Sequence, residues 1–182
     1  MARAIGMIEF KTVSSGVTAA DNMVKTADVE LLEGETVCPG KYIALIAGDL
    51  SAVKASVESA SQMYPEELID TMVLGNPHES IFPAIYGTSQ VEDISALGIL
   101  ETYDAAAIIV AADVAAKTAI VDLIELRLAK GMCGKSYLFL TGEVSAVSAA
   151  IDKAKAAISD RGMFLDSSVI AHPDEQIIRS VL

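Results

Sequence analysis

Apolar and polar residues follow one order of spacings in the first half of the chain and repeat that order in the second. A short apolar run at residues 4–10 precedes an Ala-rich stretch at residues 17–27, where apolar positions recur every three to four residues. The run is typical of a buried strand, and the stretch is typical of an amphipathic helix. Both patterns return from Ala96 onward, which indicates that the chain contains one unit twice.

The duplication can be followed residue by residue. The apolar strand that begins the chain has a close copy at residues 96–101, and most later motifs recur in the same order. The matched pairs are Asp21 with Asp113, Lys25 with Lys117, Val29 with Val121, Gly48 with Gly142 and Pro77 with Pro173. The spacing between partners grows by a few residues toward the end, so the second copy carries short insertions.

Each copy is predicted to fold in the order β-α-β-β-α-β. In the first copy we expect strands at residues 4–10, 29–35, 42–47 and 68–74, and helices at residues 17–27 and 51–63. Ser51 is a favourable N-cap for the second helix. This order is the ferredoxin-like arrangement of an α+β fold, in which the helices cover one face of an antiparallel sheet and leave the other for a partner.

The chain is therefore expected to form two tandem domains, residues 1–90 and residues 91–182. The junction between them falls near residues 87–95, where the first copy ends and the second begins. A unit of about this size can bury a small core of its own.

Charge and hydropathy exclude several classes of partner. Lys and Arg number 13 against 25 Asp and Glu, and the net charge of −12 repels a phosphate backbone, so we expect no nucleic-acid binding. Hydrophobic residues make up 52% of the chain, yet no apolar run approaches the roughly 18 residues of a membrane span. The sequence also starts without a signal peptide. A cytoplasmic protein that does not enter membranes is predicted.

The residue types that carry most enzyme chemistry are scarce or scattered. The two His residues, His78 and His172, do not occupy matching positions in the two copies, and no Ser-His-Asp set or carboxylate pair stands out. Residues 129–136 are similar to a phosphate-binding P-loop, but the leading Gly is missing and a strand pattern follows in place of a helix. We therefore predict that the protein is not an enzyme.

Taken together, these motifs resemble those of the tandem-domain shell proteins of bacterial microcompartments. The resemblance covers nearly the whole chain and includes the opening strand, the residues 20–25 of the first helix and the residues 48–53 before the second. It implies that three chains close a pseudohexameric trimer that tiles into the microcompartment shell. Other shell proteins are then the expected partners, with encapsulated enzymes as further candidates.

The segment Val37-Cys38-Pro39-Gly40 resembles the pore loop of the propanediol-utilisation T-type subunit, in which one Cys per chain reaches the central axis. The resemblance implies that Cys38 binds a [4Fe–4S] cluster there and that electrons cross the shell. Three convergent thiolates are suitable ligands for such a cluster. An alternative stays open at this stage, a pore without metal that conducts small metabolites.

Three other residues receive narrower interpretations. The resemblance places Lys25 and Lys117 at the tile edge, in contact with a neighbouring tile, although each also stands four residues after an Asp and could simply pair with it. Cys133, in the equivalent loop of the second copy, has no counterpart at the matching position, and a small buried thiol is its simpler interpretation.

Overall fold

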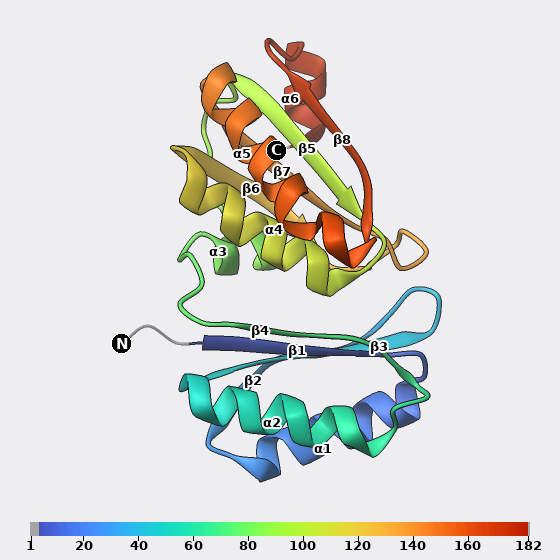
Figure 1. Cartoon of the computed structure of the whole chain (residues 1–182). Helices are drawn as coiled ribbons and strands as arrows, with labels where there is room; N and C mark the ends of the chain where they lie inside the picture. Colours follow the sequence, from blue (N-terminus) through green and yellow to red (C-terminus); the bar gives the residue numbers. More distant parts are fainter. Residues whose placement is uncertain (1–3, 182) are drawn as a thin grey trace. The chain divides into compact units, whose positions relative to one another are not determined.

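The computed structural model describes residues 4–181, and it divides into two compact units, Met1–Pro77 and His78–Leu182. Each unit is built on one four-stranded antiparallel sheet (Figure 1). Among the described residues, every helix is too short or too polar to cross a lipid bilayer.

The first unit contains four strands and two long helices. They are β1 (Ala4–Phe10), α1 (Val13–Thr26), β2 (Val29–Val37), β3 (Lys41–Gly48), α2 (Leu50–Met63) and β4 (Leu68–Leu74). The strand order β2-β3-β1-β4 places β1 in the interior, where Met7 faces Leu45 of β3 on one side and Met72 of β4 on the other. This order is that of the predicted ferredoxin-like fold.

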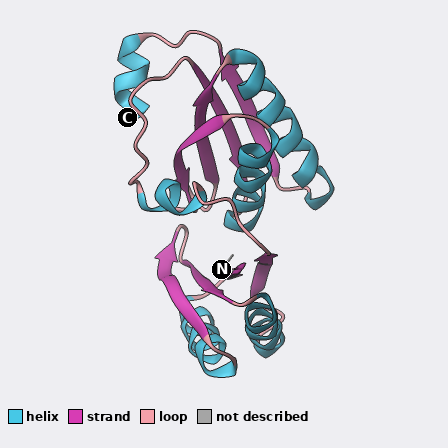
Figure 2. Ribbon diagram, turned by 90° about the vertical axis from the view of Figure 1, so that its left-hand side faces the viewer, coloured by secondary structure: helices cyan, strands magenta, loops and turns pink. Residues whose placement is uncertain are grey.

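The second unit repeats this architecture and adds short helices. Its elements are α3 (Ile81–Tyr86), β5 (Ala96–Thr102), α4 (Ala105–Thr118), β6 (Val121–Arg127), β7 (Ser136–Gly142), α5 (Val144–Ile158), a 3-10 turn (Ser159–Arg161), β8 (Phe164–Ile170) and α6 (Glu175–Val181). The strand order β6-β7-β5-β8 copies that of the first sheet. In Figure 2 the long helices of each unit lie on one face of its sheet, while α6, at the C-terminus, lies on the opposite face.

Helices and sheets pack closely because glycines face the helices. A Cβ on Gly6 of β1 would lie 2.6 Å from Val53 and 2.7 Å from Val57, both on α2. Gly98 of β5 repeats the arrangement against α5, where a Cβ would come within 2.8 Å of Val147. Real Cβ atoms do not approach this closely, so the missing side chain sets the distance between helix and strand.

Three predicted boundaries differ from the structure. The first helix begins at Val13, four residues before the expected start, because Gly16 packs directly against Tyr42 and tertiary contact outweighs weak helix propensity there. The second helix begins at Leu50 with Asp49 at the N-cap position, so Ser51 lies inside the helix and does not cap it. Strand β2 also runs two residues beyond the prediction, to Val37.

The boundary between the two compact units lies before residue 90 in the sequence. Residues 78–90 pack with the second unit, since α3 lies against β6 and buries Ile81 and Ala84. The division of the duplicated sequence at residues 90 and 91 stays a prediction about the repeat, whereas the contacts divide the chain after Pro77.

Candidate functional site

The turn between β2 and β3 presents Cys38. The backbone N–H of Gly40 donates to the Val37 carbonyl at 2.9 Å, and this bond closes the turn. Gly40 has a φ of +97°, a left-handed conformation that favours glycine, and Pro39 follows a cis peptide bond. The Val37 side chain is buried, Cys38 is half-buried, and Pro39 and Gly40 are exposed. Within the turn, Cys38 is thus the one side chain with a metal-binding atom.

A buried ion pair ties this turn to the middle of the sheet. Lys41, the first residue of β3, pairs through Nζ with Oε1 of Glu9 on β1. The Glu9 side chain is fully buried and that of Lys41 nearly so. Two charges removed from water are stable only when they stay paired, so the pair restrains the strand that leaves the turn.

The equivalent loop of the second unit has a different construction. It is longer and contains three residues with a left-handed backbone besides its C-terminal glycine: Ala129, Gly131 and Cys133. The Ser136 hydroxyl accepts a hydrogen bond from the Ala129 backbone N–H at 3.0 Å and so joins the two ends of the loop. Cys133 is exposed, so its interpretation as a small buried thiol is wrong.

The structure also tests the similarity of this loop to a P-loop. Strand β7 begins at Ser136, directly after the loop, as the sequence predicted. A P-loop binds phosphate at the N-terminus of a following helix, and here a strand occupies that place. The loop therefore cannot bind a nucleotide in the P-loop manner.

Metal binding at Cys38 would require more than one chain. Within residues 4–181, no three His, Cys, Asp or Glu side chains of a single chain gather closely enough to hold a metal ion. One chain offers one partly exposed thiol in the first turn, and soft thiolates suit iron–sulfur clusters. The donor set fits a cluster shared among symmetry-related copies.

The two helix lysines form the ion pairs that their spacing predicts. Lys25 Nζ lies 2.6 Å from Asp21 Oδ2, and Lys117 Nζ lies 2.7 Å from Asp113 Oδ2. The first pair is largely exposed, whereas the Asp113 side chain is only 6% exposed. The first pairing does not compete with the predicted edge role of Lys25, because an exposed ion pair contributes only about 0.2–1 kcal/mol and can be exchanged for another contact.

The two histidines occupy unlike surroundings. The backbone N–H of His78 donates to Asp113 Oδ1 at 2.8 Å, and its ring Nδ1 lies 2.8 Å from the Ser80 hydroxyl. His172 is exposed. His78 therefore helps to fix the chain at the start of α3.

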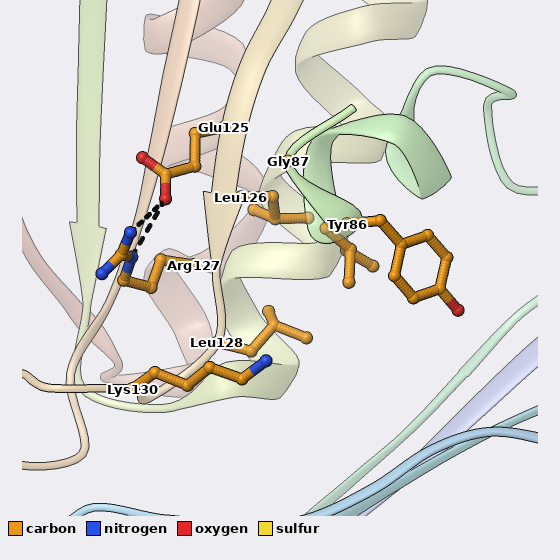
Figure 3. A pocket seen from close by; sticks show the side chains of 8 residues that line it. Tyr86, Gly87, Glu125, Leu126, Arg127, Leu128 and Lys130 are labelled. Carbon is orange, nitrogen blue, oxygen red and sulfur yellow. Dashed lines mark hydrogen bonds and ion pairs between the residues drawn. The ribbon is translucent and has the colours of Figure 1, made fainter. Parts of the chain in front are cut away.

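A polar cluster on the second unit escaped the sequence analysis. A cavity of about 290 Å³ lies beside α3 and β6 and includes Glu125 and Arg127 in its lining (Figure 3). Arg127 donates to Glu125 at 2.6 Å, and the Tyr137 hydroxyl donates to the same carboxylate at 2.7 Å. Burial, and then the bond to Glu125, raise the pKa of Tyr137 to about 12. Glu125 and Arg127 stand two apart on one face of a strand, a spacing that could have signalled the pair.

A comparison with known families finds the same domain in both repeats. The BMC domain matches residues 4–77 and again residues 96–173, so both copies belong to one domain type. The carboxysome shell protein CcmK2 of Synechocystis sp. is 37% identical over 99 residues, which cover 50% of this chain and 95% of that protein. One copy therefore corresponds to a whole single-domain relative.

Two relatives match the tandem arrangement itself. The bacterial microcompartment shell protein PduT of Citrobacter freundii is 37% identical over 182 residues, covering 100% of this chain and 99% of that protein. The crystal structure of a microcompartments protein from Desulfitobacterium hafniense DCB superposes with a TM-score of 0.90 at 42% identity, covering 98% and 99% of the two chains. Sequence and structure thus agree over the full length.

Proposed function

Since the chain belongs to the BMC-domain family and is a structural shell protein of a bacterial microcompartment, we propose that it assembles as a homotrimer with a [4Fe–4S] cluster on the threefold axis. Each chain supplies two BMC domains, so three chains supply six, and closed rotational symmetry is the usual way in which identical chains assemble. The trimer is a tile that packs beside other shell proteins. Its role is structural and electron-conducting, and it carries out no enzymatic reaction.

The observation that carries the cluster proposal is the partly exposed Cys38 thiol in the β2–β3 turn. A residue near a threefold axis occurs three times around it, so one Cys per chain suffices for three thiolate ligands. The closed turn and the buried Glu9–Lys41 pair hold the backbone beside Cys38. Preorganised ligands of this type lose little conformational entropy when a cluster binds.

Cys38 of three chains would hold three irons through their thiolates, and Pro39 and Gly40 would form the rim beside them. When bound, the cluster supplies reversible one-electron transfer. Cys133 is exposed in a loop of different length and backbone, so it is not included among the ligands.

The test is anaerobic purification followed by iron and sulfide analysis, EPR and native mass measurement. We expect about four irons per trimer in the wild type and a reducible EPR-active centre. Cys38→Ser should lose the iron and the signal while the trimer persists. Cys133→Ser is the matched control, and it should keep both.

Three results would contradict the proposal at different levels. An iron-free wild-type trimer after anaerobic reconstitution would leave Cys38 as a pore residue and favour passage of small metabolites. Iron that is lost in Cys133→Ser would assign a ligand to the second loop. A monomeric wild type would overturn the trimer itself.

A further inference from the structure

We propose that Glu9 and Lys41 are positioning residues for the Cys38 ligand, and that the retention of the cluster depends on their buried ion pair. The proposal rests on the [4Fe–4S] cluster of the preceding section and adds two residues that act on it through the β2–β3 turn. It follows from a comparison of the two repeats, because both contain the acid and the lysine, and only the first repeat pairs them.

In the first unit, the ion pair lies directly behind the turn. Lys41 begins β3 three residues after Cys38, and its Nζ pairs with Oε1 of Glu9 on the neighbouring strand β1. The two side chains are 14% and 0% exposed. The turn between them and Cys38 is closed by the bond from the Gly40 N–H to the Val37 carbonyl. The pair therefore fixes the end of a short, closed turn.

The second unit contains the same two residue types without the pair. Glu101 of β5 corresponds to Glu9, and Lys135, directly before β7, corresponds to Lys41. Within residues 78–181, no ion pair joins the side chains of Glu101 and Lys135, and both residues are partly exposed. The loop before Lys135 is longer, and its Cys133 is exposed. Duplication thus kept the residues and lost the contact.

The sheet itself does not explain the pair. The second sheet has the same strand order as the first and an equivalent central strand, and it forms without a Glu–Lys contact. Replacing a buried ion pair by apolar side chains of similar volume is often neutral for stability, because burial removes both charges from water. The feature that the first unit has and the second lacks is the closed turn that presents Cys38. We therefore assign the pair to this turn.

An ion pair suits this role because its geometry is narrow. The hydrogen bond between Lys41 and Glu9 has a preferred direction, whereas apolar contacts have none. A shift of one residue between two strands turns every side chain to the other face of the sheet, so fixing β3 against β1 also fixes the direction of Cys38. In a trimer each error in the turn occurs three times, and metal ligands tolerate only small errors of position.

The test replaces both charges together, so that neither is left buried and unpaired. Glu9→Leu/Lys41→Met is reconstituted anaerobically beside the wild type, and native mass, urea unfolding and the release of iron to a chelator are measured. We expect a trimer with a nearly unchanged unfolding transition. Residues that orient metal ligands typically contribute 10–100-fold to metal affinity, so iron should be released about tenfold faster or more, with a broadened EPR signal.

The second repeat provides the matched control. Glu101→Leu/Lys135→Met makes the same two substitutions in the copy without a pair, and it should release iron at the wild-type rate. Glu9→Met/Lys41→Leu is a second uncharged combination with a different fit, and it should behave as the first.

The reactivity of the thiol gives a readout without the cluster. In cluster-free protein with Cys133→Ser, iodoacetamide can alkylate only Cys38, which is half-buried in the closed turn. Glu9→Leu/Lys41→Met should raise the alkylation rate, because the released turn exposes the thiol more often. Glu101→Leu/Lys135→Met should leave that rate unchanged.

The outcomes separate this inference from the proposed function. A trimer with Glu9→Leu/Lys41→Met that keeps its iron as the wild type does overturns the positioning role and leaves the cluster standing. Equal iron loss in the Glu101→Leu/Lys135→Met control shows a general effect of charge and also overturns the role. If neither uncharged combination folds, the sheet requires the pair and the inference is wrong. A wild type without iron overturns both proposals.

Discussion

At the scale of single residues, Glu9 carries a charge in a place where strands usually carry apolar side chains. Every residue of β1 is buried, and Glu9 is fully so. Its partner Lys41 directly follows the turn that contains Cys38, so the charge of one residue fixes the position of another far along the chain. The ammonium group of Lys41 offsets the cost of burying this carboxylate.

Glu9→Gln should therefore destabilise the protein strongly. It leaves a largely buried ammonium group without its counter-charge, and breaking a buried pair from one side costs about 3–5 kcal/mol. Urea unfolding followed by circular dichroism measures the loss. Glu101, the counterpart in β5, is only partly buried, so Glu101→Gln should cost less than about 1 kcal/mol. Equal losses of unfolding free energy for the two variants would show that the Glu9–Lys41 pair does not stabilise the fold more than the partly buried Glu101 does.

At the scale of elements, the distance between helix and sheet depends on glycines in the central strands. Gly6 and Gly98 stand at matching places in β1 and β5, and each lies under the second helix of its repeat. The duplication preserved the close approach, which lets valines of the helix touch the strand backbone. The two glycines thus fix the distance between each of the helices α2 and α5 and its sheet.

Gly6→Ala should push α2 away from the sheet. The new Cβ would lie 2.6 Å from Val53 Cγ1, and overpacking of this kind typically costs about 1–3 kcal/mol. Differential scanning calorimetry should record a lower Tm. Gly75→Ala is the control, because a Cβ there meets Leu50 no closer than 3.6 Å, an ordinary contact. An unchanged Tm for Gly6→Ala would mean that α2 moves without cost.

At the scale of the whole molecule, the proposed trimer and its predicted packing into sheets concern two different parts of α1. The side that carries Val17 and Asp21 corresponds to a surface that is buried in the second repeat, whereas Lys25 has a side chain that is 71% exposed and stands in the last turn. We therefore expect that contacts within the proposed trimer and contacts between trimers can be altered separately.

Lys25→Ala should leave the trimer intact and weaken its packing into sheets. The exposed pair with Asp21 adds little to folding, so the loss should appear only where one tile meets another. Native mass spectrometry checks the trimer, and electron microscopy at high protein concentration checks the sheets. Lys117→Ala gives the corresponding measurement in the second repeat. Sheets that form as readily as in the wild type would contradict the edge role of Lys25.

The sequence by itself determined the fold, the duplication and the family. Those properties rest on hydrophobic spacing, and spacing is local: a strand followed by an Ala-rich helix has the same pattern wherever it packs. The similarity to shell proteins is confirmed for the same reason, since its motifs lie in continuous segments. The cluster at Cys38 and the edge roles of Lys25 and Lys117 stay predictions, because they concern contacts among several chains.

Only the tertiary structure decided what depends on residues far apart in the sequence. Val13 starts the first helix because Gly16 meets Tyr42. Glu125 joins Arg127 and Tyr137 because β6 and β7 are neighbours, and α3 packs with the second unit although the repeat assigns its residues to the first. The free energy of each feature comes from burial and pairing between distant residues. The spacing of residues along the sequence does not reveal these contacts, whereas the folded structure shows them directly.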